Sequence, residues 1–164
     1  MKILKIFLTA VALFVLERVL FVRQFEIFSL TPWLLFTFSL TVASVSEEYN
    51  DALATAFFCG LAADISGGGE FGSATAVFTL SAAAVYFFSS RLFRNSLIIA
   101  LVGVFVFGLG GEMIYFFLNG RGISDFSALQ TLWSVALPLA VIDTVFALVL
   151  YPLAKRLFAG RRYV

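Results

Sequence analysis

Six apolar runs, separated by short polar breaks, fill almost the whole chain. They cover Ile3 to Val22, Thr31 to Val45, Ala52 to Ser66, Gly72 to Ser89, Ser96 to Leu118 and about Leu129 to Leu153. A helix needs roughly 20 apolar residues to cross the hydrocarbon layer of a membrane. The pattern therefore predicts an all-α integral membrane protein, a bundle of six transmembrane helices that forms a single polytopic domain over residues 1–164.

The break from Gly60 to Gly72 is rich in glycine and carries an acid, Asp64, close to the bend. We expect it to form the outer end of a membrane hairpin between the third and fourth crossings. Reading the same stretch as a re-entrant turn gives five crossings and puts the termini on opposite sides. The sequence leaves this alternative open.

Basic residues are concentrated in the segments that six crossings place in the cytoplasm. These segments hold Lys2, Lys5, Arg91, Arg94, Lys155, Arg156, Arg161 and Arg162, whereas the opposite loops hold Arg23 and Arg121. Because Lys and Arg are enriched in cytoplasmic loops, we expect both termini in the cytoplasm. Residues 1–5 and 155–164 then form short basic ends, and the second of these suits anionic lipids better than a protein partner.

Composition narrows the chemistry. Hydrophobic residues make up 62% of the 164 and charged residues 13%, against roughly 25% charged in soluble domains. With no His and a single Cys, the chain lacks the commonest metal ligand and acid/base catalyst. The G-x-G-x-x-G match at residues 67–72 follows a membrane helix rather than a strand, so it does not indicate a dinucleotide site. We expect no enzymatic activity, no cofactor or metal, and no nucleic-acid partner.

Small residues recur at helical spacing on both sides of the glycine-rich break. They are Ala52, Ala56, Gly60 and Ala63 in the third run, and Gly72, Ala76, Thr79 and Ala83 in the fourth. Small side chains let helix backbones approach each other within a membrane. We therefore expect the two faces to pack together, with Asp64 one turn beyond Gly60 on the same face.

Ionisable residues inside the apolar runs are costly and are functional candidates by default. The set is Glu17, Arg18, Asp64, Glu112 and Asp143. The first four lie in the outer half and Asp143 lies nearer the middle, so one cluster is geometrically possible, with the partner of Arg18 open. In the alternative interpretation Glu17 and Arg18 reach the outer interface and Asp64 caps a loop. Pro138 is expected to bend the last crossing.

The stretch Gly60-Leu61-x-x-Asp64, followed by glycines and Phe71-Gly72, resembles the G-L-x-x-D…(L/F)-G signature of the bacterial rod shape-determining protein MreD family. Further points of similarity are Pro32 at the start of the second crossing, Pro138 and Asp143 in the last, and the ending Tyr151-Pro152-Leu153. The triple glycine with Glu70 is more polar than the usual loop of that family.

The resemblance implies a non-enzymatic scaffold of the cell-wall elongation machinery in the bacterial inner membrane. Its partners would be MreC, directly, and then the glycosyltransferase RodA, a class B penicillin-binding protein and the MreB filament, besides membrane lipids. Candidate partner-binding or structural residues are Gly60, Asp64, Gly67, Gly72, Arg18, Glu112, Pro138 and Asp143. The family is also similar in helix arrangement to the substrate-binding S-components of energy-coupling-factor transporters, which supplies an alternative function: a small-molecule-binding subunit of a vitamin-type transporter.

Overall fold

The computed structural model describes residues 2–24, 33–66, 70–92, 96–119 and 132–158, with the side chains of 2–5 and 19–24 left out. These ranges contain six α-helices and one π-helical turn and no strand. The elements are α1 (Lys2–Gln24), α2 (Leu34–Val45), α3 (Tyr49–Ser66), α4 (Ser73–Arg91), α5 (Leu97–Leu118), the π turn η2 (Leu132–Ala136) and α7 (Leu137–Phe158). The predicted all-helical fold is confirmed for this part of the chain.

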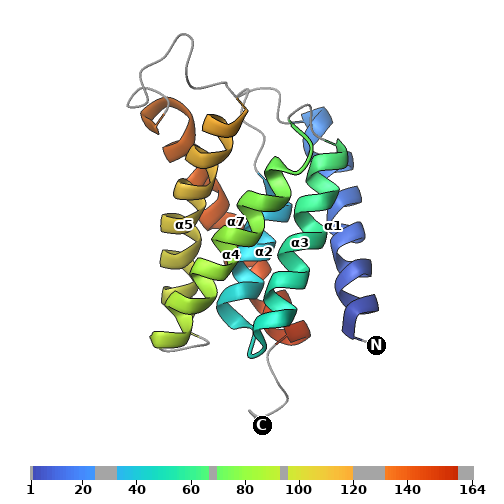
Figure 1. Cartoon of the computed structure of the whole chain (residues 1–164), viewed down its shortest axis with the longest axis vertical. Coiled ribbons are helices and arrows are strands. Elements are labelled where there is room, and N and C mark those ends of the chain that lie inside the picture. Colours follow the sequence, from blue (N-terminus) through green and yellow to red (C-terminus); the bar gives the residue numbers. More distant parts are fainter. Residues whose placement is uncertain (1, 25–32, 67–69, 93–95, 120–131, 159–164) are drawn as a thin grey trace.

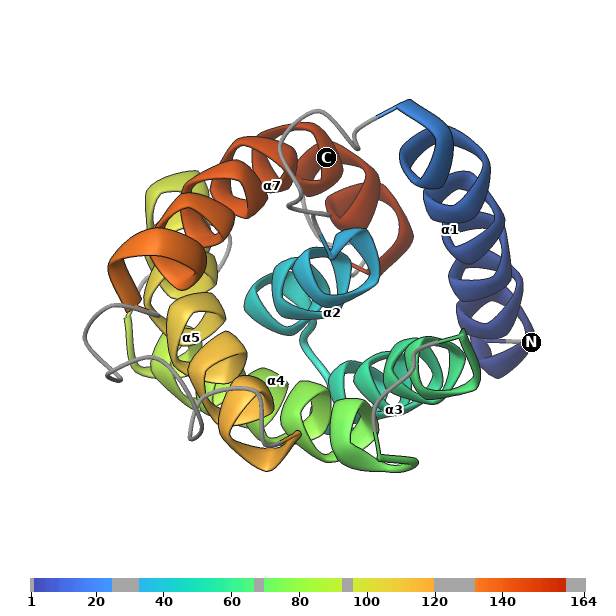
Figure 2. The ribbon, with the colours of Figure 1, turned by 90° about the horizontal axis from the view of Figure 1, so that it is seen from above.

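Helix α2 lies at the centre of the bundle, and α1, α3, α4, α5 and α7 surround it (Figure 2). All twelve of its residues are buried. Its hydroxyl groups bond to the helix's own backbone, as when Thr41 donates to the Thr37 carbonyl at 2.7 Å. At about 18 Å long, α2 is too short to cross the hydrocarbon alone. Because protein shields it on every side, α2 does not need the length of a lipid-exposed span.

Successive helices run in opposite directions, so that the start of α1 and the end of α7 lie at the same end of the bundle (Figure 1). The ends of α1, α3 and α5 and the starts of α2 and α4 meet at the opposite end. That opposite end carries most of the contacts described in the next section, and we call it the joint end.

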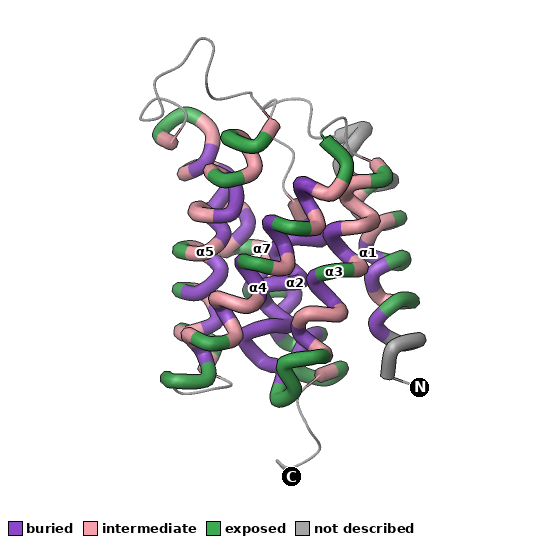
Figure 3. Tube along the Cα trace, in the orientation of Figure 1, coloured by how far each residue is buried: buried purple, intermediate pink, exposed green. Residues whose placement is uncertain are grey.

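The outside of the bundle is apolar. Buried stretches face the interior and exposed ones face outward (Figure 3), and the exposed side chains include Ile98 at 72% and Val149 at 69%. Within the ranges that the structure describes, three helices are long and apolar enough by length and composition to cross a membrane, namely Ser73–Arg91, Leu97–Leu118 and Leu132–Phe158. An apolar surface this extensive belongs in lipid, because soluble monomers rarely expose large apolar patches.

Several predicted boundaries are wrong by a few residues. Helix α3 begins at Tyr49, inside the break predicted to be polar, and α7 continues to Phe158. Lys155 and Arg156 therefore belong to the last turn of α7 rather than to a tail, where positive charge complements the negative end of the helix dipole. Likewise the basic residues of segment 2–5 lie within α1. Pro32 lies outside the described residues.

Pro138 lies in the first turn of α7, directly after the π turn. A proline has no N–H to bond the carbonyl four residues earlier, which here is the carbonyl of Ser134. The regular α-helical pattern is interrupted at that point, since Leu132–Ala136 adopts the wider π geometry. Single π turns are a recognised cause of helix kinks, and the bend predicted at Pro138 remains a prediction.

The small-residue face predicted on α4 is wrong. Ala76 is exposed, and Thr79 and Ala83 are only half-buried. Helix α4 buries instead the face that carries Ala74, Val77, Phe78, Ser81, Ala82 and Val85. Helix α4 packs against α2 and α5 as well as α3, and its buried face combines small residues with the larger Val77, Phe78 and Val85. The predicted face of α3 is better placed, with Ala52, Ala56 and Gly60 buried.

Candidate functional site

Asp64, near the end of α3, caps the start of α4. Its Oδ1 accepts a hydrogen bond from the Ala74 N–H at 2.9 Å, and its Oδ2 accepts from the Thr75 N–H at 3.0 Å and from the Thr75 hydroxyl. The first N–H groups of a helix have no partner within it, and the N-cap residue, Gly72, has no side chain to offer one. A carboxylate also complements the positive end of the helix dipole. Asp64 therefore joins the two helices of the hairpin.

Two glycines give this joint its geometry. A Cβ added at Gly60 would lie 2.5 Å from Thr75 Cα and 3.2 Å from the Ala74 carbonyl oxygen, so only glycine lets the backbones of α3 and α4 come this close. Gly72 has φ of +94°, in the left-handed region that glycine adopts without strain. Gly60, Asp64 and Gly72 thus act together: all three shape the contact between the end of α3 and the start of α4. Gly67 lies outside the described residues.

Glu17 and Arg18 of α1 complete the ends of two further helices. The Leu35 N–H, in the first turn of α2, donates to Glu17 Oε2 at 3.1 Å. Arg18 Nη2 donates to the carbonyl of Ser66, the last residue of α3, at 2.7 Å. An acid at a helix start and a base at a helix end both complement the helix dipole. These neighbours in sequence thus hold α1 against two different helices.

Asn119 forms a fourth contact of this kind, which was not among the residues expected from the sequence. Its Oδ1 accepts from the Glu70 N–H at 2.8 Å, and its Nδ2 donates to Tyr115 O at 2.9 Å and to Ser73 Oγ at 3.3 Å. Asn119 follows the last residue of α5 and so ties that end to the start of α4. The available signal was an asparagine directly after a long apolar run, which is typical of a helix C-terminus.

A pair of carboxyl groups lies inside the bundle. Glu112 of α5 and Asp143 of α7 are 2% and 1% exposed, and their side chains are close enough to interact. Among the described residues, Glu112 Oε2 and both carboxylate oxygens of Asp143 accept no hydrogen bond of normal geometry, although Asp143 lies close enough to interact with Thr37 and the Trp33 backbone as well as with Glu112. Ionised carboxylates are very costly to bury unless they are paired. We call these two side chains the carboxyl pair.

The packing around the carboxyl pair is tight on the α5 side. A Cβ added at Gly111 would lie 2.5 Å from Phe36 Cζ of α2 and 2.8 Å from Ser81 Oγ of α4. Glycine at this position lets α5 approach the central helix, which brings Glu112 into the core. Gly108, Gly111 and Glu112 are all buried, so this face of α5 is a packing face.

The charged cluster that the sequence made possible forms in part, since Glu17 interacts electrostatically with Arg18 and with Asp143, and Asp143 with Glu112. Arg18 and Asp64 bond to the ends of α3 and α4, whereas Glu112 and Asp143 face each other in the interior. Glu17 lies between these groups, since it caps α2 and is near enough to Asp143 to interact with it electrostatically. Arg18 donates its hydrogen bond to a backbone carbonyl, that of Ser66, and interacts electrostatically with Glu17.

Among the described residues, no group of three or more His, Cys, Asp and Glu side chains could hold a metal ion. Cys59 is fully buried in the core.

The family model of the rod shape-determining protein MreD matches residues 1–160. The chain belongs to the MreD family. No curated protein and no solved structure gives a match to it.

Membership of the MreD family confirms the resemblance drawn from the Gly60 to Gly72 signature. It assigns the chain to the determination of rod cell shape. In this MreD protein, the signature residues that the structure describes build the α3–α4 joint.

Proposed function

We propose that this MreD protein is a non-enzymatic scaffold of the rod-shape machinery in the bacterial inner membrane. Its six helices cross the membrane, both termini lie in the cytoplasm, and it links the cell-wall synthesis machinery through MreC. RodA, a class B penicillin-binding protein and the MreB filament are the further members of the complex.

The family match over residues 1–160 carries this proposal. The use of the interior polar groups supports it: Glu17, Arg18 and Asp64 each bond to the end of a neighbouring helix. Such contacts fix the shape of a bundle. A rigid bundle with an apolar outer surface suits a protein that positions others within the membrane.

Co-purification of MreC tests the direct contact. We expect equal amounts of MreC per folded molecule to co-purify with three tagged proteins: the wild type, Asp64→Asn and Gly110→Ala. All three keep the contact between α3 and α4. Gly60→Leu is expected to lose MreC together with its fold, because a side chain as large as leucine does not fit beside Thr75. Recovery of no MreC by folded wild-type protein would refute the direct contact.

A second candidate function, a small-molecule-binding subunit of a vitamin-type transporter, draws on one observation: the unpartnered oxygens of the carboxyl pair. A ligand with hydrogen-bond donors would satisfy them. If this function is correct, mass spectrometry of the purified, denatured protein will detect a released small molecule that Asp143→Asn no longer retains. The scaffold function predicts no such molecule.

A further inference from the structure

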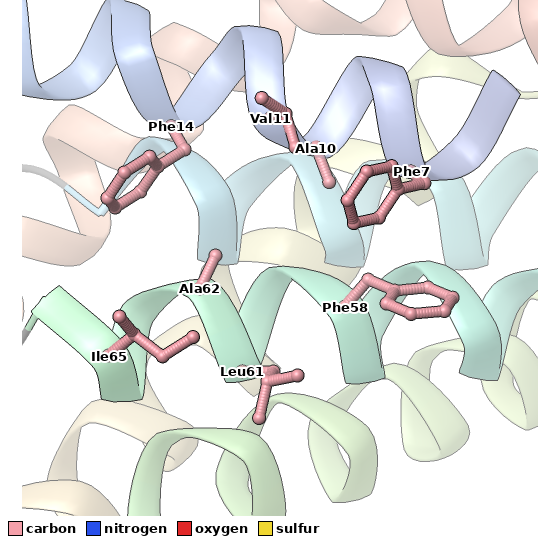
Figure 4. A pocket seen from close by; sticks show the side chains of 8 residues that line it. All are labelled: Phe7, Ala10, Val11, Phe14, Phe58, Leu61, Ala62 and Ile65. Carbon is pink, nitrogen blue, oxygen red and sulfur yellow. The ribbon is translucent and has the colours of Figure 1, made fainter. Parts of the chain in front are cut away.

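An apolar groove of about 310 Å³ runs between α1 and α3 on the outside of the bundle (Figure 4). Both helices contribute its lining, and every lining side chain is apolar. Ala10, which is 2% exposed, and Ala62 leave room between the larger side chains. The groove therefore has the shape and chemistry to hold a thin hydrocarbon chain.

The two ends of the groove differ. At one end Phe7 and Phe58 meet edge to face, with ring centroids 6.0 Å apart (Figure 4). At the other end lie Phe14 and Ile65, and Ile65 is 71% exposed. The aromatic pair narrows the first end, and the second end opens toward the joint end of the bundle.

A cation lies at the open end. Arg18 is one helical turn beyond Phe14, and its guanidinium carbon is 5.8 Å from the centre of the Phe14 ring. Its Nη2 bonds the Ser66 carbonyl, one residue beyond Ile65, while the side chain as a whole is exposed. An arginine has five N–H donors, so one bond to a carbonyl leaves donors for a second acceptor. The arrangement complements an anionic group whose attached chain enters the groove.

The length of the site matches that of one acyl chain. Eleven residues separate Phe7 from Arg18, which is roughly 16 Å along a helix, and the acyl chains that fill half of the hydrocarbon layer extend over roughly 15 Å. A lipid whose phosphate lies at Arg18 would thus reach the aromatic end with its acyl chain. A transmembrane helix of a partner would instead need an apolar face through both leaflets.

The geometry points to a binding site for one anionic phospholipid, with an acyl chain in the groove between α1 and α3 and its phosphate on Arg18. Arginine binds phosphate oxygens with two parallel N–H bonds. This site is independent of the scaffold function and of MreC, because it needs only the contacts within this chain.

Site-specific quenching by brominated lipids tests the proposal. The full-length protein carries Phe14→Trp as a reporter in the groove, and a second protein carries Val106→Trp, a matched reporter on the exposed face of α5. Trp33 and Trp133 remain, and the signal of the parent protein is subtracted. Both reporters are measured in nanodiscs that contain brominated phosphatidylglycerol or brominated phosphatidylethanolamine at equal mole fraction.

The groove reporter is expected to prefer phosphatidylglycerol by about fivefold, the factor that one basic residue near anionic lipid contributes. Arg18→Gln should remove this preference, and Ala62→Leu should lower quenching by both lipids because it fills the groove. The Val106→Trp reporter should show neither effect. The proposal would be overturned if both lipids quenched the groove reporter equally and Arg18→Gln changed nothing. It would also be overturned if neither brominated lipid quenched the groove reporter, a result that would place a protein segment in the groove.

Discussion

Single side chains in this protein complete the ends of helices other than their own. Asp64 supplies the N-terminal cap of α4, and Glu17 does the same for α2. The first N–H groups of a helix have no partner within it, and each one left buried and unpaired costs about 1–3 kcal/mol. Substitutions at these positions should therefore affect stability more than their partial exposure indicates.

Gly60 and Gly110 form a matched pair for testing the close approach of α3 and α4. A Cβ at Gly60 would lie 2.5 Å from Thr75 Cα, whereas a Cβ at Gly110 would meet nothing within 4 Å. Gly60→Ala should lower the free energy of unfolding by about 1–3 kcal/mol through overpacking. Gly110→Ala should be neutral or stabilise by up to about 1 kcal/mol, because alanine favours a helix over glycine. Thermal unfolding of the two purified variants in detergent measures both effects, and equal melting temperatures would show that the contact is not tight.

Asp64 should tolerate an amide better than an apolar residue. Asp64→Asn keeps one acceptor oxygen for the start of α4, whereas Asp64→Leu leaves the Ala74 and Thr75 N–H groups without a partner. Loss of a cap costs about 0.5–2 kcal/mol, and unpaired buried donors add about 1–3 kcal/mol each. We expect melting temperatures in the order wild type, Asn, Leu. If Asp64→Leu melted with the wild type, the capping role would be wrong.

Removal of charge from the carboxyl pair should leave the fold intact. Glu112→Gln and Asp143→Asn keep the shape of the side chains and remove the cost of burying a carboxylate. Both variants are expected to melt at or above the wild-type temperature and to restore rod shape in cells depleted of the native protein. An amide variant that folds normally but leaves the cells round would show that a carboxyl group at that position has a functional role.

At the scale of the helices, the chain shows why a short segment can lie at the centre of a membrane bundle. Helix α2 has twelve residues, all of them buried, and its serine and threonine hydroxyls bond to nearby carbonyls of its own backbone, as Ser39 does to Phe36. Because these hydroxyl groups are hydrogen-bonded within their own helix, burying them costs little. The surrounding helices provide the apolar faces that meet lipid.

Helix positions were largely predictable from sequence, because apolar runs and polar breaks reflect the thickness of the hydrocarbon layer. The contact between Gly60 and α4 was also predictable from the spacing of small residues. The face of α4 was not, since Ala76 fits a small-residue pattern but points outward, and only the arrangement of α2 and α5 decides which face is buried. The hydrogen bond from Arg18 to the Ser66 carbonyl was hidden for a related reason, because backbone groups leave no trace in sequence patterns.

For the whole molecule, the joints at one end have a structural consequence. Four side chains connect helix ends at the joint end, namely Asp64, Glu17, Arg18 and Asn119. The proposed topology places this end outside the cytoplasm. The outward ends of five helices would thus form one connected unit, on the side of the membrane where the cell wall is built.

Labelling of single cysteines tests this orientation. Glu70 is exposed at the joint end, and Arg91 and Lys155 are exposed at the other. A membrane-impermeant maleimide should label Glu70→Cys in intact spheroplasts but should label Arg91→Cys and Lys155→Cys only after lysis. Cys59 adds little background because it is fully buried. The reverse labelling would invert the topology, and opposite results for Arg91→Cys and Lys155→Cys would indicate an odd number of crossings between those two positions.

Cell shape after depletion distinguishes a scaffold from an uptake subunit. Cells that lose this protein are expected to become round in minimal and in rich medium alike, and expression of the wild-type chain, but not of Gly60→Leu, should restore rods. Microscopy of the length-to-width ratio in each medium provides the readout. If a supplied nutrient restored rod shape while the protein stayed absent, the chain would serve uptake and the scaffold function would be refuted.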